Sequence, residues 1–362
     1  GQLSRHLAQA LMAQPSERLD FRFLIPRDRM DLIADQSACC IPIRNWHRQR
    51  VRRWTDWVGL RCMPLGECDL WHWPHQDSEY WPPDSQVPVV LNILDLNFLY
   101  EGKSRRKTQL RLYRLQQKVD RASCVVAISD FTASEVRRHL QLGDRPIHVV
   151  PMGVDSIPPR HCQRPDFLPP GDFLYTIGDI SPKKNFRVLL DLMIRLPEYR
   201  LVMAGRKTSA YAQAIQQQIE RRHLQHQILM PGQIDDDVRQ WLYQHCSAFL
   251  FPSLAEGFGL PVIEAMKLGR PVFMSTRTSL PEVGGPLGFY WHDFQPDNMY
   301  QTFCEGMRLF EQDSQYEEKL RHYAARFSWQ RAAQQYVDIY ESVLAQEAAF
   351  STSDQPISRV CA

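Results

Sequence analysis

The chain has 362 residues, of which 44% are hydrophobic and 23% are charged, and its formal net charge is +2. This length exceeds what one hydrophobic core usually holds, so we expect two domains of an ordinary globular protein. No apolar run is long enough to cross a membrane, and the first residues, GQLSRHLAQALMAQ, have the pattern of an amphipathic helix rather than of a signal peptide, which predicts a cytoplasmic protein.

Residues 1–165 carry 24 Lys and Arg against 18 Asp and Glu, so this half is the one expected to contact an anionic surface. Nine cysteines without a C-x-x-C pair favour reduced thiols over a disulfide framework or a zinc site.

Short apolar runs alternate with stretches of helical period along the whole chain. In the first half these runs are FRFLI at 21–25, VPVVLNI at 87–93, CVVAI at 124–128 and IHVV at 147–150. In the second half they are FLYTI at 173–177, RLVMA at 200–204, QILM at 227–230, AFLF at 248–251 and PVFM at 271–274. This alternation predicts βα units on parallel sheets, with two doubly wound α/β domains facing a cleft.

The helices and the domain limits follow from the same patterns. The clearest helix is expected over 185–195, where Phe186, Leu189, Leu190, Met193 and Ile194 form one apolar stripe. The proline-rich stretch 156–171 has neither helical nor strand period, which predicts a stiff linker. Residues 326–348 have a helical pattern, and the tail from Ser351 is expected to be frayed. The predicted domains are 1–160 and 161–330, with a C-terminal helix and tail, 331–362, packing back toward the first domain.

The stretch from Phe249 to Arg270, FLFPSLAEGFGLPVIEAMKLGR, contains the strongest candidate site. A buried strand is expected to end at a loop that carries Glu256, and two glycines then leave backbone amides uncovered before Pro261 begins a helix. The open N-terminus of such a helix attracts phosphate or sugar oxygens. A second carboxylate, Glu264, follows eight residues after the first. The pattern indicates a ligand with both hydroxyl and phosphate groups.

A second cluster lies at GDISPKKN, where Gly178 ends a predicted strand and Lys183 and Lys184 precede a helix. Taken alone, the two lysines are typical of a solvated helix start. The carboxyl ends of parallel strands meet at one edge of a sheet, however, so these lysines and the Gly205-Arg206-Lys207 turn are expected beside Glu256. Cations and open amides at such an edge can hold a diphosphate.

The second half resembles the nucleotide-sugar domain of family four retaining glycosyltransferases, which have the GT-B architecture. The motifs that carry the resemblance are GDISPKKN, LVMAGRK, PGQIDDDVRQWLYQHCSAFLFPS, EGFGLPVIEAMKLGRPV and SLPEVGG, and EGFGLPVIE matches the E-x7-E signature of the family. The first half is similar more weakly, through DLWHWPH, VVLNILDLNFLY, ISDFTASEV and VVPMGVD. The resemblance covers nearly the whole chain, and it implies an acceptor-binding first domain and a donor-binding second domain.

The resemblance also implies a role for individual residues. Glu256 and Asp95 take catalytic positions, with Glu256 at the hydroxyls of the donor sugar. The implied donor-binding residues are Gly178, Lys183, Lys184, Arg206, Gly257, Phe258, Gly259, Leu260 and Glu264, of which Glu264 would bind the ribose and the cations would neutralise the diphosphate. Cationic side chains and helix dipoles replace a metal in this fold class, so neither a metal nor a cofactor is expected. The donor is a nucleoside diphosphate sugar linked to GDP, UDP or dTDP.

The chain departs from the family pattern at several positions. The family often has His-Asp where this chain has Leu94-Asp95, which puts the first-domain half of the site in doubt. His72 or His75 could supply an imidazole instead, although a structural histidine with satisfied hydrogen bonds is the more frequent case, and Ser129 is a further candidate near the acceptor. Asp179 stands where many relatives carry Arg. The first strand of the family should precede the helix of Leu3 to Leu11, and Gly1 is either a remnant of its loop or a cloning scar.

Residues 44–61, RNWHRQRVRRWTDWVGLR, interleave arginines with three tryptophans, and a second basic run extends from Lys103 to Lys118. Arginine with tryptophan suits an anionic membrane face, but a pair of ordinary amphipathic helices fits the pattern equally well. Single-stranded nucleic acid could also use this composition, yet the sugar-nucleotide motifs argue against it. With the resemblance, the segment predicts a peripheral contact with the inner membrane.

The prediction from sequence is thus a retaining glycosyltransferase that moves a hexose-type residue to a saccharide or lipid-linked saccharide in bacterial lipopolysaccharide or surface polysaccharide synthesis. Two alternatives remain at this stage. One is a catalytically silent scaffold that binds a sugar nucleotide, which Leu94 suggests. The other is a sugar-nucleotide epimerase on the same architecture, against which the EGFGLPVIE motif argues.

Overall fold

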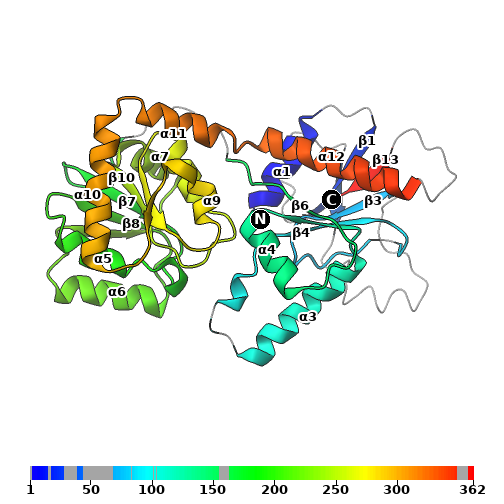
Figure 1. Cartoon of the computed structure of the whole chain (residues 1–362), viewed down its shortest axis with the longest axis horizontal. Helices are drawn as coiled ribbons and strands as arrows, with labels where there is room; N and C mark the ends of the chain where they lie inside the picture. Colours follow the sequence, from blue (N-terminus) through cyan, green and yellow to red (C-terminus); the bar gives the residue numbers. More distant parts are fainter. Residues whose placement is uncertain are drawn as a thin grey trace. The chain divides into compact units, whose positions relative to one another are not determined.

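The computed structural model describes residues 2–14, 18–27, 39–43, 68–82, 84–100, 102, 104–154, 163–348 and 358–362. The chain divides into two compact units (Figure 1). The first consists of Gly1–Gly153 together with Ser328–Ala362, and the second is Val154–Phe327. Each unit is built on its own parallel sheet. The basic segment 44–61 and residues 156–162 of the predicted linker lie outside the described residues.

The first unit has a seven-stranded parallel sheet in the order β2-β1-β13-β3-β4-β5-β6. Its strands are β1 (Leu19–Pro26), β2 (Cys40–Ile43), β3 (Leu70–Trp73), β4 (Val89–Ile93), β5 (Cys124–Ala127), β6 (Ile147–Val149) and β13 (Ser358–Cys361). Its helices are α1 (Gln2–Met12), the short 3-10 helix η4 (Asn97–Leu99), α3 (Arg105–Arg121), α4 (Asp130–His139) and α12 (Trp329–Ala348). Helices α1 and α12 cover one face of the sheet, and α3 and α4 cover the other (Figure 1).

The four strands that the apolar runs predicted in this half are confirmed as β1, β4, β5 and β6. The expectation of a frayed tail from Ser351 is wrong for residues 358–361, which form β13, an interior strand of the sheet. The strand lies between β1 and β3, and its backbone bonds to both: Leu24 N donates to Ala362 O (2.7 Å), and Asp69 N donates to Arg359 O (2.9 Å). A four-residue strand is too short to give a period, and its partners are far away in sequence.

The second unit has a six-stranded parallel sheet in the order β12-β11-β10-β7-β8-β9. Its strands are β7 (Phe173–Ile177), β8 (Arg200–Ala204), β9 (Ile228–Gly232), β10 (Ala248–Phe251), β11 (Val272–Ser275) and β12 (Phe289–Trp291). Its helices are η5 (Pro182–Lys184), α5 (Val188–Ile194), α6 (Ala210–Arg221), α7 (Asp236–His245), α8 (Leu260–Lys267), α9 (Leu280–Gly284), η6 (Gly285–Leu287), α10 (Pro296–Gln312) and α11 (Tyr316–Ala325). All five strands that the sequence predicted here are present.

The helix expected over 185–195 is shorter in the structure, because η5 precedes it and α5 begins only at Val188. Phe186, Leu189, Leu190 and Met193 are fully buried against the sheet, as the apolar stripe predicted. Ile194 is 51% exposed, so the stripe does not include it. It is the last residue of α5, where the chain leaves the helix before the next turn can cover that position.

Candidate active site

The carboxyl ends of β7, β8 and β10 bring the sequence-predicted donor residues of the second unit together. Gly178 follows β7, Arg206 follows β8, and the loop with Glu256 follows β10. Because these three strands are neighbours in a parallel sheet, their following loops share one edge. The structure therefore joins residues that are up to 78 positions apart in the chain.

Glu256 and Lys184 form an ion pair at this edge. Lys184 Nζ lies 2.6 Å from Glu256 Oε1, and the side chains are only 12% and 14% exposed. Ser253 Oγ donates a second hydrogen bond to the same carboxylate oxygen at 2.6 Å, and Lys184 Nζ also lies 4.6 Å from the centre of the Phe251 ring. The pair thus places an acid for hydroxyl groups and an ammonium for phosphate oxygens side by side.

The backbone around Lys184 requires two unusual conformations. Gly178 has φ +152°, a conformation that favours glycine, and a Cβ atom there would lie 3.0 Å from Lys184 Cε and press on the lysine side chain. Asn185, which ends η5, has φ +54°. Asparagine tolerates this left-handed conformation better than most residues, and here it turns the chain from Lys184 into α5.

The loop after Glu256 has open backbone amides, as the sequence predicted. Gly259, the N-cap of α8, has φ +124° and no side-chain cap. Within the described ranges, the amide groups of Phe258 and Gly259 make no hydrogen bond. Together with the N-terminal end of α8, they form a surface that favours anionic oxygens.

Two other predicted cations are placed differently from Lys184. Arg206 forms a two-pronged pair with Asp179, with Nε to Oδ1 at 3.1 Å and Nη2 to Oδ2 at 3.0 Å. Both side chains are more than half exposed, so this pair contributes little to stability and the guanidinium can change partners. Lys183 acts through its backbone carbonyl, which accepts from Leu254 N (2.7 Å) and from Ser253 Oγ (3.1 Å).

Glu264 lies among groups that the sequence did not point to. Burial lowers the pKa of Arg239, but the carboxylates of Glu264 and Asp236 more than offset this and leave its pKa raised. Burial raises the pKa of Tyr175 and of Tyr243, and the nearby Glu264 raises both further. Glu264 thus lies near enough to a guanidinium and two phenols to shift their pKa values. No sequence signal marked Arg239 or the tyrosines, because they lie within ordinary strand and helix patterns.

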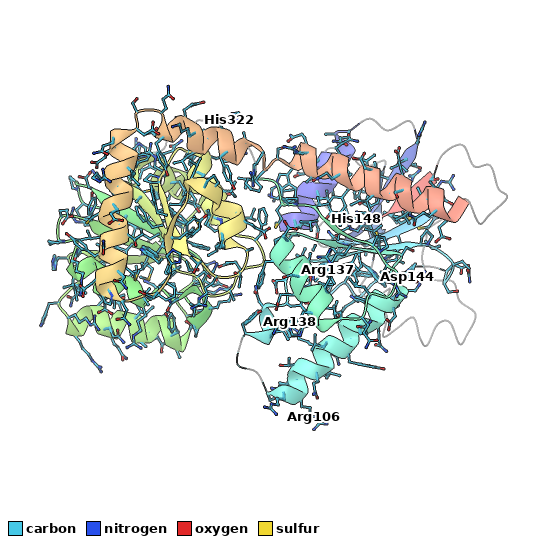
Figure 2. All side chains as sticks on the ribbon, in the orientation of Figure 1. Arg106, Arg137, Arg138, Asp144, His148 and His322 are labelled. Atoms are coloured by element: carbon cyan, nitrogen blue, oxygen red, sulfur yellow. The ribbon has the colours of Figure 1, made fainter. Side chains whose placement is uncertain are left out.

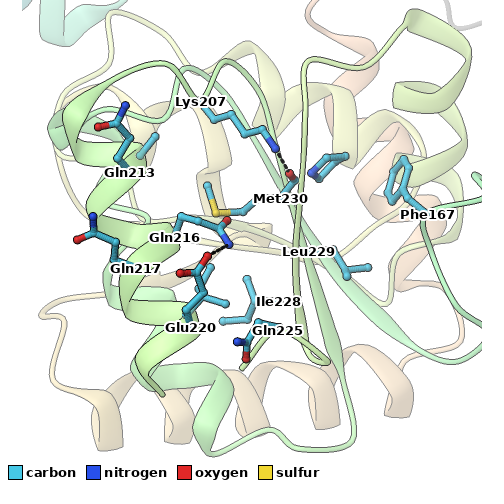
Figure 3. A pocket seen from close by; sticks show the side chains of 13 residues that line it. Phe167, Lys207, Gln213, Gln216, Gln217, Glu220, Gln225, Ile228, Leu229 and Met230 are labelled. Atoms are coloured by element: carbon cyan, nitrogen blue, oxygen red, sulfur yellow. Dashed lines mark hydrogen bonds between the residues drawn. The ribbon is translucent and has the colours of Figure 1, made fainter. Parts of the chain in front are cut away.

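A groove of about 700 Å³ lies next to this edge, along the outermost strand β9 (Figure 3). Helix α6 forms one wall and Phe167 stands across from it, while Ile228, Leu229 and Met230 belong to β9 between them. Lys207 Nζ donates a hydrogen bond to the carbonyl of Met230 at 2.8 Å. This bond satisfies a backbone acceptor of the edge strand β9. The groove therefore begins at the turn after β8 and continues away from Glu256.

The candidate residues Asp95 and Ser129 belong to the first unit, where each is held by local hydrogen bonds. Asp95 Oδ1 accepts from Asn97 N at 2.9 Å, and Gln76 binds the same loop twice, donating to Asp95 O and accepting from Leu94 N, both at 2.9 Å. Ser129 is fully buried and caps α4 by accepting from Thr132 N at 3.0 Å. Its hydroxyl is therefore used within the helix start.

The two candidate histidines, His72 and His75, differ in burial and in hydrogen bonding. His72 is buried with both ring nitrogens bonded: Nε2 donates to Asn92 Oδ1 (3.1 Å), and Nδ1 accepts from the Tyr340 hydroxyl (3.0 Å). This is the satisfied structural histidine that the sequence left open. His75 is only partly buried, and its Nδ1 accepts from Asp77 N at 2.9 Å. Both histidines line a cavity of about 360 Å³ at the carboxyl ends of β1 and β3.

The buried His72 makes a pH-dependent contribution to the stability of the first unit. Burial lowers its pKa to about 4, whereas an unfolded histidine titrates near 6.5. Between these values the unfolded chain binds a proton that the folded chain does not, so stability falls as the pH drops from about 6.5 to 4, by about 3 kcal/mol in total. Thermal unfolding of the first unit measured from pH 7 to pH 4.5 should show this loss. The variant His72→Gln, which does not titrate, should flatten the profile; an unchanged slope would contradict the assignment.

Comparison with known proteins identifies the family of the chain. A family profile described as "Glycosyl transferases group 1" matches residues 164–327, and one described as "Glycosyltransferase Family 4" matches residues 15–156. "O-antigen chain mannosyltransferase B" of Escherichia coli is 31% identical over 290 residues, which cover 74% of this chain and 75% of that protein. The chain belongs to the group 1 glycosyltransferases. "Serotype-specific mannosyltransferase WbdA" of Escherichia coli is 30% identical over 244 residues, but the match spans only 29% of that longer protein.

Solved structures show the fold of this glycosyltransferase to be GT-B. The sucrose-phosphate synthase of Thermosynechococcus elongatus has a TM-score of 0.71 at 18% identity, covering 96% of this chain and 94% of that one. Anabaena HepE in complex with UDP-glucose has a TM-score of 0.66 at 16% identity, covering 90% and 100%. The family resemblance and the two α/β units predicted from the sequence are confirmed. In the part of the chain that the structure describes, no helix is long and apolar enough to cross a membrane, and no group of three or more His, Cys, Asp and Glu side chains could hold a metal ion.

Proposed function

We propose that this glycosyltransferase moves a hexose-type residue from a nucleoside diphosphate sugar to a saccharide or lipid-linked saccharide during synthesis of a bacterial surface polysaccharide, with retention of the anomeric configuration. The observation that carries the proposal is the Lys184–Glu256 ion pair beside the open amides of Phe258 and Gly259. Relatives named as O-antigen mannosyltransferases support mannose as the first sugar to test.

In this proposal the second unit binds the donor. Glu256 accepts hydrogen bonds from hydroxyls of the sugar, the amides of Gly257 to Leu260 bind sugar and phosphate oxygens, and Glu264 binds the ribose. Lys184, with Arg206 once it leaves Asp179, neutralises the charge that develops on the departing diphosphate. Such electrostatic stabilisation needs donors that are in place before the bond breaks, which the ion pair and the capless helix α8 supply.

The proposed chemical step is a front-face displacement. The bond between the anomeric carbon and the phosphate oxygen breaks first, and its electron pair leaves with the diphosphate. The acceptor hydroxyl then forms the new bond on the same face, and its proton goes to the phosphate oxygen that has just left. No protein nucleophile is needed, so the carboxylate of Glu256 stabilises the sugar without forming a covalent bond.

The first unit is the proposed acceptor-binding domain, with Asp95 and His75 nearest to the acceptor. Leu94 replaces the frequent family histidine, and its backbone amide is held by Gln76. The loop is thus ordered without an imidazole at that position.

The test is a screen of GDP-, UDP- and dTDP-sugars for thermal stabilisation, followed by transfer assays with mannose-containing oligosaccharides. A bound donor should raise the unfolding temperature by mass action, and NMR of the product should show the anomeric configuration of the donor. An inverted product would contradict the retaining mechanism. Donor binding without transfer to any acceptor would favour a silent scaffold, and conversion of the donor without an acceptor would favour an epimerase.

We also propose that the protein works on the cytoplasmic face of the inner membrane, bound peripherally through the first unit. The segment 44–61 lies outside the described residues, and the proposal therefore rests on α3, which belongs to the second basic run. Its first half combines exposed Leu110 (48%) and Tyr113 (62%) with exposed cations. Arg106 projects from α3, and Arg137 and Arg138 from α4 (Figure 2). Apolar side chains between cations suit the headgroup layer of an anionic bilayer.

Vesicle sedimentation tests this membrane contact. The double variant Leu110→Ser and Tyr113→Ser should bind vesicles with 30 mol% phosphatidylglycerol about 10-fold more weakly, because two apolar side chains no longer enter the lipid. Leu309→Ser, at an equally exposed leucine of α10, is the matched control and should bind as the wild type does. Equal binding to neutral vesicles would refute a role for the cations.

A further inference from the structure

Thr278 has a backbone conformation that its residue type disfavours. The described part of the chain has three non-glycine residues with positive φ: Asn185 (54°), His223 (56°) and Thr278 (55°). His223 follows the end of α6, where a left-handed residue is common, and asparagine adopts this region readily. Threonine is β-branched, and for such a residue a positive φ is a real outlier. A strained residue persists only where its surroundings hold it.

Thr278 contacts the loop that carries Glu256, residues 252–259 between β10 and α8, which we call the donor loop. Thr278 lies between β11 and α9, and its Oγ1 accepts a hydrogen bond from the amide of Glu256 at 3.0 Å. The next residue, Ser279, is fully buried, and its Oγ lies 2.7 Å from Phe258 O and 3.2 Å from Glu256 O as a donor. The 275–279 loop therefore holds the backbone on both sides of Glu256.

A third hydroxyl of the same loop extends this attachment. Ser275 Oγ donates to Ser253 O, and it also accepts from Arg277 N at 3.2 Å. Ser253 is the residue whose own hydroxyl binds the Glu256 carboxylate. Three hydroxyls in five residues thus bind the backbone of the donor loop, while Lys184 and Ser253 bind the Glu256 side chain.

The direction of the Thr278 bond has a consequence for ligand binding. The Glu256 amide is already donated to Thr278, so it is not among the groups that a ligand oxygen would meet. The amides of Phe258 and Gly259 stay open within the described residues. Thr278 therefore takes up the amide of Glu256, whereas Ser279 binds only carbonyl groups of the loop and leaves the Phe258 amide open.

We propose that Thr278 is a positioning residue: its left-handed backbone aims the hydroxyl at the Glu256 amide and thereby fixes the carboxylate and the following open amides for the donor sugar. This inference rests on the proposed function, because it assigns a role through Glu256. Thr278 itself does not touch the reacting atoms. Small displacements of positioned groups lower the rate much more than they lower stability.

The test compares Thr278→Val with Thr278→Ser in the full chain. Valine keeps the shape and the β-branch but removes the acceptor, whereas serine keeps the hydroxyl. Thr302→Val, on the exposed side of α10, makes the same chemical change away from the site and is the control. Two quantities are measured: kcat and KM for transfer, and the ratio of Kd for the nucleoside diphosphate to Kd for the nucleotide sugar that gives the largest thermal shift.

We expect Thr278→Val to lower kcat by about 10- to 100-fold and to reduce the ratio of Kd values, because the sugar-dependent part of the affinity depends on Glu256. Thr278→Ser should restore both quantities to within about 3-fold of the wild type, and Thr302→Val should leave them unchanged. Two results would overturn the proposal: valine without effect on either quantity, or serine as impaired as valine. If the wild type binds a nucleotide sugar but transfers it to no acceptor, the proposed function fails while the ratio still decides the role of Thr278. If it binds no nucleotide sugar, both fail.

Discussion

Replacing Glu256 with glutamine is expected to lower kcat for transfer by about 10³-fold while the chain stays folded. The amide keeps the size of the side chain and an oxygen that can accept from Ser253 Oγ, which lies 2.6 Å from the carboxylate. It removes the negative charge that pairs with Lys184 and that would stabilise positive charge at the anomeric carbon. A factor of 10³ corresponds to about 4 kcal/mol of transition-state stabilisation, which is in the range measured for single preorganised groups in other enzymes.

The same substitution should cost about 1–3 kcal/mol of stability, because Lys184 loses its ionic partner in a site that is mostly removed from water. The cation keeps its contact with the Phe251 ring, which limits the loss. Thermal unfolding and donor-dependent turnover, measured on one preparation, separate the two effects. Glu317→Gln is the matched control, since Glu317 pairs with Arg270 and Arg321 on the surface of the same unit. Turnover within a few-fold of the wild type in Glu256→Gln would remove Glu256 from the catalytic residues.

The parts of the site that the sequence could predict are those that depend on the order of residues within one loop. Gly257, Gly259 and Pro261 predict open amides and a helix start locally. Within the described residues the amides of Phe258 and Gly259 are open, and α8 begins at Leu260. Parallel strands bring their carboxyl ends together, so the approach of Lys184 to Glu256 follows from the strand pattern alone. The strand pattern does not predict which of the cations pairs with Glu256. In the structure Arg206 pairs with Asp179 instead, and Lys183 contributes its backbone carbonyl.

What could not be predicted depends on contacts between distant segments. Thr278 directly precedes the SLPEVGG motif as an ordinary loop residue. Its φ is +55°, and its hydroxyl accepts a hydrogen bond from the Glu256 amide in another loop. Arg239 looks like a solvated residue of α7 until the fold places Glu264 near it. The role of His72 depended equally on Tyr340, which is 268 positions away in the chain.

The last strand, β13, was missed for the same reason, and it leads to the largest expected effect on stability. Placing a carboxylate at Val360 should unfold the first unit or reduce its free energy of unfolding by at least about 4 kcal/mol. Val360 is fully buried and sits between Phe21 of β1 and Leu70 of β3 in the register of the sheet. The side chain at this position is removed from water, so a carboxylate there would lose its hydration, and the strand joins β1 to β3.

The graded variant Val360→Ala should cost only about 1–3 kcal/mol, since it removes two methyl groups but leaves the backbone hydrogen bonds in place. Calorimetry should resolve the two units, because each has its own core, and only the transition of the first unit should shift. Leu309→Asp, at an exposed position of the second unit, is the control for an added charge. If Val360→Asp unfolded at the wild-type temperature, β13 could not be an interior strand of this sheet. The first unit would then have to close its sheet by pairing β1 directly with β3, which would leave Ser358–Cys361 without the backbone bonds described above.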